Sequence, residues 1–546
     1  MKADVTPAGT YDYVIVGAGS AGCVLAYRLS QDPSVRVLVL EAGGHDRSPI
    51  IKVPLTWGLI LKHRLFDWGY FTEAEPGMDG RRIELARGRV VGGSSSINGM
   101  AYARGMAEDY DGWAAEFGLP DWSYGRVLPF FKRSETWQGG ASALRGGDGP
   151  LTVARLDFKD ELVDAFMQSA DRAGFKRTDD YNGADAEGFG PMQATLRRGR
   201  RCSAAVAFLR PALKRGNVHL QTGATAGAIR FEGGRATGIE YRHDGEAKFA
   251  RATREVALCG GVINSPQLLM LSGIGDPAKL APHGIPVRAA LPGVGRNLQD
   301  HVVCDVQWRR TENGPLHRGL RLDRIAADLA RTALFGTGGL TSGVPAAAVG
   351  LVRSSPDVAL PDALFILAAG PMHAAPHFAP FLKPYQDAFG IKGVMLQPES
   401  RGEISLRSAD PAAHPVVQQN FLSTEHDRRT IRNMVRRMRA IGQEAPLRPF
   451  IADELAPGKD AQSDDAIDAF VRRTAITLHH PVGTCRMGAD DDPDAVLDDA
   501  GRVRGVDALR VVDGSAMPRV VRGPTNAPIM MMAEKIADRM LGNVAA

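Results

Sequence analysis

The clearest pattern of hydrophobic and polar positions lies in the first 45 residues. Residues 13–16 are a short β-favouring run that ends at a glycine turn, which predicts a buried strand. Residues 20–30 predict a helix that must end before Pro33, and residues 37–40 predict a second buried strand. Strand, helix and strand fit within about 30 residues, as one βαβ unit requires. The pattern predicts a parallel sheet with packed helices, the α/β class.

Two later segments are predicted to add strands to the same sheet. Residues 256–259 predict a buried strand, followed by a helix that starts with Ser265 as cap and Pro266 in its first turn. Residues 509–512 predict another strand, and Asn526 is a candidate cap for a helix with apolar residues at helical spacing. One folding unit is therefore assembled from distant pieces of the chain.

Composition and charge exclude several classes of protein. The 546 residues are 44% hydrophobic and 23% charged, as in ordinary globular proteins, but 62 glycines exceed the usual share of about 7%. A formal net charge of +4 lacks the concentrated positive field that nucleic-acid binding needs. We interpret the basic cluster at residues 197–201 as a solvated or interdomain face, and we expect no nucleic-acid partner.

The cysteines and the apolar runs indicate in which cellular compartment the protein is expected. The five cysteines are scattered without a Cys-x-x-Cys motif, so we expect neither a disulfide framework nor a zinc site. No metal is expected, and Met530, Met531 and Met532 are interpreted as core residues. We expect no signal peptide, because the first apolar run is short, and nowhere do 18 apolar residues run together. We expect a cytoplasmic protein with no transmembrane span, and peripheral membrane association stays open.

Gly17, Gly19 and Gly22 form a G-x-G-x-x-G motif between the first strand and the first helix. Such glycines permit a tight turn, a close approach of the backbone to a pyrophosphate, and close packing of helix on strand. Glu41 lies at the end of the second strand, where a carboxylate can accept hydrogen bonds from an adenosine ribose. The motif alone could be a simple glycine turn, but the added strand and acid favour a dinucleotide. The pattern does not distinguish nicotinamide from flavin.

A second segment, residues 88–99, carries four glycines and three serines. Small side chains let a main chain lie flat against a planar or polyanionic ligand. On composition alone, an ordinary mobile loop is the favoured alternative.

This segment and several others resemble the glucose-methanol-choline (GMC) family of flavin oxidoreductases. The resemblance covers nearly the whole chain, in blocks at residues 88–98, 261–275, 293–301, 480–488, 512–518 and 525–528, with Tyr102, Arg104, Gly105 and Asp109 following the first block. It implies a Rossmann-like FAD-binding domain with a parallel sheet, and a substrate-binding domain built on an antiparallel sheet with helices. We assign residues 1–155, 201–305 and 477–546 to the first domain, and residues 156–200 and 306–476 to the second.

The resemblance also implies which residues hold FAD. Ala226 stands near the adenine, where family members usually have valine, and residues 93–101 line the flavin. Asn98 occupies the position at which some members attach flavin through a histidine, so we expect non-covalent FAD. The expected cofactor-binding residues are Gly17, Gly19, Ser20, Gly22, Glu41, Ala42, Gly43, Arg89, Gly92, Gly93, Ser94, Asn98, Gly99, Met100, Ala101, Ala226, Asp513, Gly514, Asn526 and Pro528.

The expected reaction is oxidation of the CH–OH group of a small alcohol by hydride transfer to flavin N5. The protein must supply a proton acceptor, and imidazole suits that role near neutral pH. By family position the general base is His480, and Asn526 donates a hydrogen bond to the substrate oxygen. His479 is the neighbour that could be mistaken for the base. Val262 and the Leu478-His479 pair depart from the family pattern and put substrate shape in doubt.

Two other functions stay open at this point: a hydroxynitrile lyase that keeps flavin and His480 but performs no net oxidation, and a non-enzymatic dinucleotide-binding protein. The resemblance favours a dehydrogenase over an oxidase. The electron acceptor, whether quinone, cytochrome or dioxygen, is not legible in the sequence.

Overall fold

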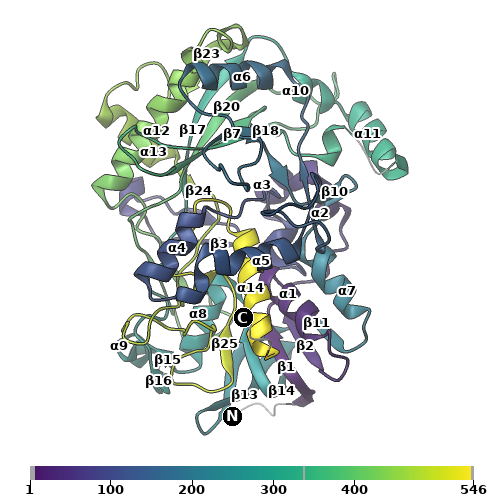
Figure 1. Cartoon of the computed structure of the whole chain (residues 1–546), viewed down its shortest axis with the longest axis vertical. Helices are drawn as coiled ribbons and strands as arrows, with labels where there is room; N and C mark the ends of the chain where they lie inside the picture. The colour runs from purple at the N-terminus through teal and green to yellow at the C-terminus, as the bar shows by residue number, and fades with distance from the viewer. Residues whose placement is uncertain (1–5, 336–338, 543–546) are drawn as a thin grey trace.

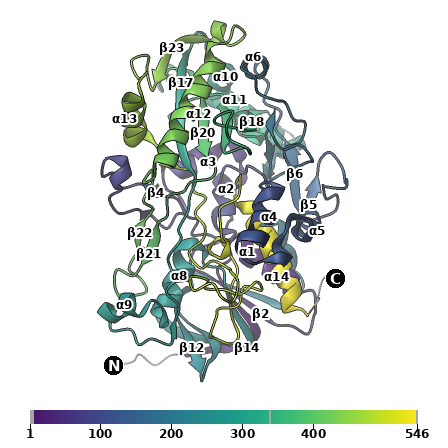
Figure 2. The same cartoon turned by 60° about the vertical axis from the view of Figure 1, so that its left-hand side comes forward.

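A computed structural model of the chain describes residues 6–335 and 339–542. Figure 1 shows two β-sheets placed one above the other along the long axis, the lower containing β1 (Thr6–Val16) and the upper β17 (Val302–Arg310). In Figures 1 and 2, α12 (Glu425–Gln443) lies beside the upper sheet, and α14 (Asn526–Met540) lies beside α1 (Ser20–Leu29) below. The other helices of eight residues or more in the described chain are α4 (Ala107–Glu116), α5 (Tyr124–Ser134), α6 (Glu161–Arg172), α8 (Gly261–Leu271), α11 (Leu322–Phe335) and α13 (Asp464–Thr474).

The lower sheet contains the predicted βαβ unit. Its parallel part runs in the order β11 (Val218–Thr222), β2 (Val37–Glu41), β1, β14 (Glu246–Leu258) and β25 (Leu509–Val511). The strands predicted at residues 13–16, 37–40, 256–259 and 509–512 are therefore confirmed as neighbours. Two further strands, β12 (Thr225–Glu232) and β13 (Arg235–His243), extend the sheet in antiparallel fashion from the first half of β14. This antiparallel extension was not predicted from the sequence.

The parallel strands all end at one edge of the lower sheet. β1 ends directly before Gly17, β2 ends at Glu41, β14 ends before Gly260, and β25 ends before Asp513. In open parallel sheets, ligands bind in the crevice outside the carboxyl ends of the strands. The topology thus brings Gly17, Glu41, Gly260 and Asp513 to one edge of the sheet.

Two helix starts differ from prediction. Helix α8 begins at Gly261 and not at Ser265, because the Ser265 hydroxyl is used otherwise: it accepts from the Gly260 amide and donates to Asp513. Asn526 is the first residue of α14 and not its cap, which is Thr525. The three methionines of α14 are buried in the core, as predicted.

The upper sheet is antiparallel, as expected. Its order is β23 (Ile451–Ala456), β17, β20 (Ala388–Met395), β19 (Ala363–Ala368), β18 (Ala346–Val352) and β7 (Gly188–Pro191), with β24 (Ile476–Thr477) paired to the start of β17. Gly393 of β20 leaves room for Met434 and Met438 of α12, since a Cβ there would lie 2.9 Å or less from both methyl groups. The boundaries of the two domains stay predictions.

All five cysteines are buried, and none of them forms a disulfide. Within the described residues, every helix is too short or too polar to cross a bilayer.

Candidate active site

The turn from β1 to α1 leaves no room for a side chain at Gly17 or Gly22. A Cβ on Gly17, whose φ is +105°, would lie 2.4 Å from the Cys259 carbonyl oxygen, and a Cβ on Gly22 would lie 1.9 Å from that of Gly17. Gly19 precedes α1 and offers no side-chain cap, so the first amides of the helix are left without a side-chain acceptor. Open amides at the positive end of a helix dipole suit a diphosphate. The first glycine motif therefore fits a dinucleotide.

Glu41 closes the same turn from the end of β2. Its Oε2 accepts a hydrogen bond from the Ala18 amide at 2.9 Å, and its Oε1 accepts one from the Gly43 amide at 2.8 Å. Burial raises the pKa of Glu41 to about 7. Each oxygen keeps a second lone pair that can accept from a ribose hydroxyl. Ala226 lies two residues after Ala224, whose amide donates to the Glu41 carbonyl.

The second glycine-rich segment packs directly on the first. Gly93 has a φ of +54°, and a Cβ there would lie 2.7 Å from the Cα atom of Gly19. The Gly92 amide donates to the Ala18 carbonyl at 2.7 Å, and the Ser95 hydroxyl donates to the Gly92 carbonyl at 2.6 Å. Gly92, Gly93 and Ser95 are buried. The alternative of an ordinary mobile loop is wrong, because both segments form one close-packed cradle.

The other predicted cofactor-binding residues of this segment, and Ala42 after β2, make the following contacts. The Arg89 guanidinium lies 4.8 Å from the centre of the Trp68 ring, and the Ser94 hydroxyl accepts from the Gly88 amide. Gly99 faces Trp57, and Ala101 forms a bridge to Ala194 of β8 (Gln193–Ala194). The Met100 amide donates to the side-chain oxygen of Asn98, and Ala42 lies between Glu41 and Gly43 in the turn after β2.

Arg201 fixes the far end of the segment. Its Nη1 donates to the carbonyl and the side-chain oxygens of Asn98, at 2.6 and 2.7 Å, and to the Ser95 carbonyl; its Nε donates to the Ile51 carbonyl. The side chain is only 4% exposed, and burial lowers its pKa to about 9. Its Nη2 has no hydrogen-bond partner, and no carboxylate of the described chain forms an ion pair with it. The basic cluster is thus not a uniform solvated face, since this member is internal.

The C-terminal block meets the same edge of the sheet. The Asp513 carboxylate accepts from the Gly261 amide at 2.9 Å, the Ser265 hydroxyl at 2.6 Å, and both the amide and hydroxyl of Ser515. Burial raises the pKa of Asp513, and these four donors oppose that shift. These contacts join the loop after β25 to the start of α8.

Gly514 and Pro528 lie in the same block. A Cβ on Gly514 would lie 3.2 Å from Val262, one of the residues that depart from the family pattern. Pro528 is buried in the first turn of α14.

Ser20 and Asn526 connect the starts of two helices. The Ser20 hydroxyl donates to Oδ1 of Asn526 at 2.7 Å, which joins the first residue of α1 to the first residue of α14. The amide nitrogen of Asn526 remains available as a donor, because its oxygen is the acceptor in this contact. A predicted cofactor residue and a predicted catalytic residue are thus in direct contact.

His480 contacts a second histidine, His301. The two Nδ1 atoms lie 3.0 Å apart, and the rings meet edge to face at 81°. Burial is the main cause that lowers the pKa of His480 well below its ordinary value, and His301, Arg87 and His479 add to the effect. Burial also lowers the pKa of His301 to about 4. Both rings are therefore neutral at pH 7.

Asp300 and His479 support the backbone around His480. The His480 amide donates to Asp300 at 2.8 Å, and the Thr477 hydroxyl donates to the other carboxylate oxygen at 2.5 Å. Burial raises the pKa of Asp300 to about 6. His479 has a φ of +63° and turns its Nδ1 to the Ala86 amide at 3.2 Å, so its ring is directed differently from that of His480.

Sequence reasoning missed the roles of His301 and Arg201. His301 lies in the block at residues 293–301, which resembled the family but received no assignment, so the signal was present. Arg201 stands in a run of exposed arginines, and nothing in that pattern separates the one buried member. Among the described residues, no hydrogen bond joins His480 to Asn526. The Gly483 amide, which donates to the Gly514 carbonyl at 3.1 Å, links the segment after His480 to the segment after β25.

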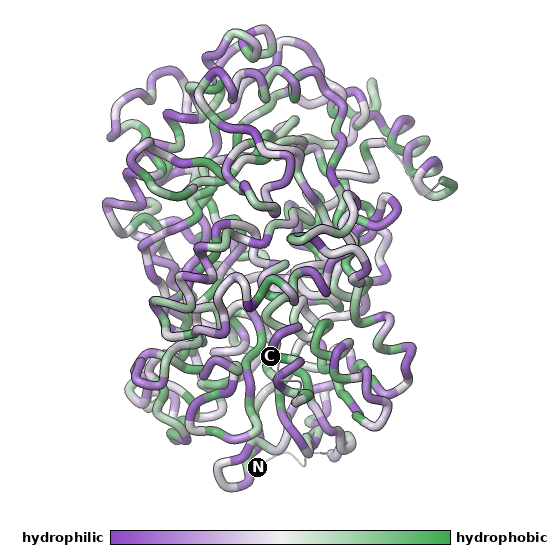
Figure 3. The backbone as a smooth tube through the Cα atoms, viewed as in Figure 1, coloured by the Kyte–Doolittle hydropathy of each residue, from purple (hydrophilic) through white to green (hydrophobic). Residues whose placement is uncertain are grey.

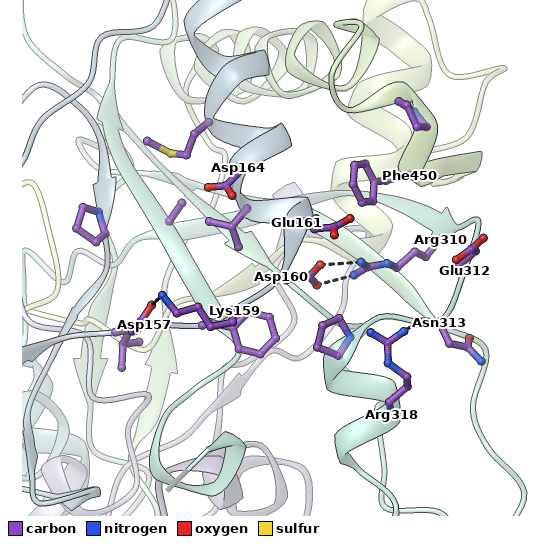
Figure 4. A pocket seen from close by; sticks show the side chains of 18 of the residues that line it. Asp157, Lys159, Asp160, Glu161, Asp164, Arg310, Glu312, Asn313, Arg318 and Phe450 are labelled. Carbon is purple, nitrogen blue, oxygen red and sulfur yellow. Dashed lines mark hydrogen bonds and ion pairs between the residues drawn. The ribbon is translucent and has the colours of Figure 1, made fainter. Parts of the chain in front are cut away.

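A cavity of about 880 Å³ lies elsewhere, beside α6 and the far end of β17. Figure 4 shows that its labelled lining is largely charged and that Asp160 and Arg310 face each other in a two-bond ion pair, at 2.7 Å each. None of the predicted site residues lines this cavity. It is therefore separate from the cradle at the strand ends.

The fold and the cradle define a dinucleotide-binding protein of the α/β class that also holds a contacting pair of buried histidines, His301 and His480. Residues 11–303 and 398–533 match two family models described as GMC oxidoreductase. The chain belongs to the GMC oxidoreductase family. It is an FAD-dependent oxidoreductase of the alcohol type, and the narrow glycine cradle, the open helix amides and the unpaired Nη2 of Arg201 fit that cofactor.

Relatives of the chain are similar over nearly their full length. An oxygen-dependent choline dehydrogenase of Rhizobium etli is 44% identical, covering 97% of this chain and 95% of its own. The mitochondrial choline dehydrogenase of Homo sapiens is 44% identical, covering 98% and 90%. Among solved structures, pyridoxine 4-oxidase from Mesorbium loti has a TM-score of 0.86 at 31% identity, covering 97% of this chain and 99% of that one.

Proposed function

We propose that the chain oxidises the CH–OH group of a small alcohol to an aldehyde or ketone, with His480 as the base that takes the hydroxyl proton. FAD, when bound, supplies the hydride acceptor at N5. The observation that carries the proposal is the contact between Nδ1 of His480 and Nδ1 of His301. It occupies one nitrogen of His480, while no hydrogen bond from the described residues reaches the other.

The neutral state of His480 supports its role as a base. The lowered pKa keeps the imidazole unprotonated at neutral pH, as a proton acceptor must be. The backbone carbonyls of Leu396 and Val521 favour a proton on the His301 ring, and Nε2 of His301 is buried without a hydrogen-bond partner in the described chain. We assign the His301 proton to this nitrogen. Nδ1 of His301 then accepts from Nδ1 of His480, which leaves Nε2 of His480 with the lone pair.

Asn526 orients the substrate oxygen. Because its side-chain oxygen accepts from Ser20, its amide nitrogen is the group free to donate to an alcohol or alkoxide oxygen. Such a donor stabilises the negative charge that grows on oxygen as the proton leaves.

We infer that FAD is held without a covalent bond. Asn98 has no nucleophilic nitrogen to attack flavin, and its oxygen is engaged by Arg201 and by the Met100 amide. Precipitation of the holoenzyme with acid should release all the yellow colour into the supernatant. Colour that stays with the pellet would contradict this inference.

Choline is the first substrate to test, because the relatives at 44% identity are named choline dehydrogenases. Anaerobic mixing of the holoenzyme with choline, aliphatic alcohols and pyridoxine should bleach the flavin absorbance with at least one of them. Turnover is then compared with an artificial dye, with a quinone and with dioxygen, and we expect the dye or the quinone to support the faster rate. A His480→Ala variant that binds FAD but bleaches as fast as the parent would remove His480 from this role.

A further inference from the structure

The segment that carries His480 begins with a residue in an unusual backbone conformation. His479 has a φ of +63°, in the left-handed region that residues other than glycine seldom adopt. Such a residue persists only where its surroundings hold it. Because His480 follows directly, the turn at His479 decides where the His480 ring points.

Three hydrogen bonds hold this turn. The Thr477 hydroxyl accepts from the His479 amide at 2.7 Å, and Nδ1 of His479 accepts from the Ala86 amide at 3.2 Å. The His479 carbonyl accepts from Nη2 of Arg87, whose Nε donates to the Ala86 carbonyl at 2.5 Å. One guanidinium thus bridges two backbone carbonyls, and of the three bonds to His479 it makes the charge-assisted one.

Arg87 reaches the turn from a distant part of the chain. It follows β4 (Glu84–Leu85), which pairs with β3 (Tyr70–Phe71), and it directly precedes the glycine-rich segment at residues 88–99. Figure 1 shows β3 and β24 in the middle of the molecule, between the two sheets, and Figure 3 shows hydrophilic and hydrophobic stretches interspersed there. One side chain therefore joins the start of the glycine-rich segment to the segment that carries His480.

Asp300 holds the other end of the same peptide group. Its carboxylate accepts from the His480 amide at 2.8 Å, while Arg87 donates to the His479 carbonyl of that peptide. The negative end of the peptide dipole thus meets a cation, and its positive end meets a carboxylate. Rotation of this peptide would break both charge-assisted bonds at once. The charge of Arg87 also opposes the rise that burial causes in the pKa of Asp300.

Arg87 is also one of the groups that act on the His480 ring. Burial is the largest cause of the lowered pKa of His480, and His301, Arg87 and His479 lower it further. Burial lowers the pKa of His301 to about 4 and that of His479 to about 3, so both rings are neutral at pH 7. Of these three neighbours, Arg87 therefore carries the permanent charge, and a fixed positive charge disfavours the imidazolium form of His480.

We propose that Arg87 is a positioning residue for the alcohol oxidation: together with Asp300 it clamps the peptide between His479 and His480 and so orients the His480 ring. This role presupposes the function proposed above, in which His480 is the base. Arg87 acts through the backbone of the base and through its charge, and the two effects can be separated by substitution.

Two substitutions make that separation. Arg87→Lys keeps the positive charge but not the fork of donors, and Arg87→Gln keeps an amide donor but not the charge. Each FAD-loaded variant is mixed anaerobically with the alcohol that bleaches the parent fastest. We expect flavin reduction at pH 8 to be about 10- to 100-fold slower in both, because neither side chain holds both carbonyls. The loss should fall on the limiting rate and leave the half-saturating alcohol concentration nearly unchanged, as expected of a residue that positions the base and not the substrate.

The rate at pH 5.5, as a fraction of the rate at pH 8, reports on the charge. Arg87→Gln should keep a smaller fraction than the parent, because loss of the positive charge raises the pKa of His480 and of Asp300. Arg87→Lys should keep the parent's fraction. Arg82→Gln is the matched control: Arg82 lies five positions earlier and donates to a backbone carbonyl as well, that of Thr72 at 3.0 Å. It should equal the parent in rate and in fraction.

Two results would overturn the proposal. Arg87→Lys could reduce flavin at the parent rate, or Arg87→Gln could be slow but keep the parent's fraction at pH 5.5, which would make Arg87 a purely structural residue. His480→Ala distinguishes this failure from that of the proposed function. If His480→Ala reduces flavin at the parent rate, both proposals fail; if it is inactive, the failure is confined to Arg87. Visible spectra of bound FAD confirm that each variant is folded before it is compared.

Discussion

Nδ1 of His301 lies 3.0 Å from Nδ1 of His480, and strand register is the reason. β17 pairs antiparallel with β24 so that Val302 opposes Thr477, and the Leu478 amide donates to the His301 carbonyl at 3.0 Å. The histidine that precedes β17 is thereby placed against the histidine that follows β24. The relative positions of the two rings are set by backbone pairing, and in their mutual contact one Nδ1 donates and the other accepts.

Replacement of His301 tests that coupling. His301→Ala should lower the rate of flavin reduction by alcohol about 10- to 100-fold while FAD binding is retained, because His480 loses the acceptor that fixes its tautomer. His301→Asn, whose side-chain oxygen can accept from Nδ1, should recover part of the rate. The reduction rate is measured by anaerobic stopped flow. Equal rates in His301→Ala and the parent would show that the contact only packs the core.

The pH profile tests the state of His480. An ordinary imidazole loses its base function as the pH falls through about 6.5. The pKa of His480 lies well below that value because the ring is buried, so its neutral form persists as the pH falls. We expect the rate of flavin reduction to stay flat between pH 8 and 6.5. A decline centred near 6.5 that disappears in His480→Gln would contradict the lowered pKa.

The pH dependence of FAD affinity tests Glu41. Its pKa in the folded protein is raised to about 7 by burial, so the carboxylate gains its charge only as the pH rises through that value. The ionised form is the better acceptor for a ribose hydroxyl, and the affinity of the apoprotein for FAD should therefore rise from pH 6 to 8, by up to about tenfold per pH unit below the pKa. Fluorescence quenching titrations measure the affinity. Glu41→Gln should bind more weakly and show no such slope.

These predictions rest on a site that the sequence only partly specified. The glycine turn, Glu41 and the C-terminal block were predictable because tight turns, strand ends and a family resemblance leave local signals. The burial of Arg201 was not, since its neighbours in the run are exposed and only the fold decides which arginine turns inward. The early start of α8 was missed because Ser265 has the residue type of a cap but bonds Asp513, which lies 248 positions away.

Ser20 and Asn526 provide a double-mutant test. Ser20→Ala removes the hydroxyl that holds the Asn526 amide, which should cost about 1 kcal/mol, or roughly fivefold in kcat, because the amide can then rotate. Asn526→Ala should cost more, since the donor itself is lost. The double variant should be no slower than Asn526→Ala alone, because the hydroxyl acts through the amide. Additive losses would show that Ser20 acts on the cofactor independently.

Arg201 is the remaining residue whose loss has a definite expected outcome. Arg201→Met removes the donor to the oxygens of Ile51, Ser95 and Asn98, and each buried carbonyl left without a partner costs about 1–3 kcal/mol. The apoprotein should melt at a lower temperature, and FAD should dissociate faster. The variant also removes a buried cation for which the described residues provide no ion pair, and this cation holds the segment that we propose lines the flavin. A positive charge near the flavin favours its more negative, reduced form. The midpoint potential of the bound flavin should therefore fall, by about 30 mV if the reduced-to-oxidised ratio changes tenfold. Arg201→Lys, which keeps the charge but not the fork of donors, should restore the potential more fully than the melting temperature; a potential equal in all three proteins would leave Arg201 with a purely structural role.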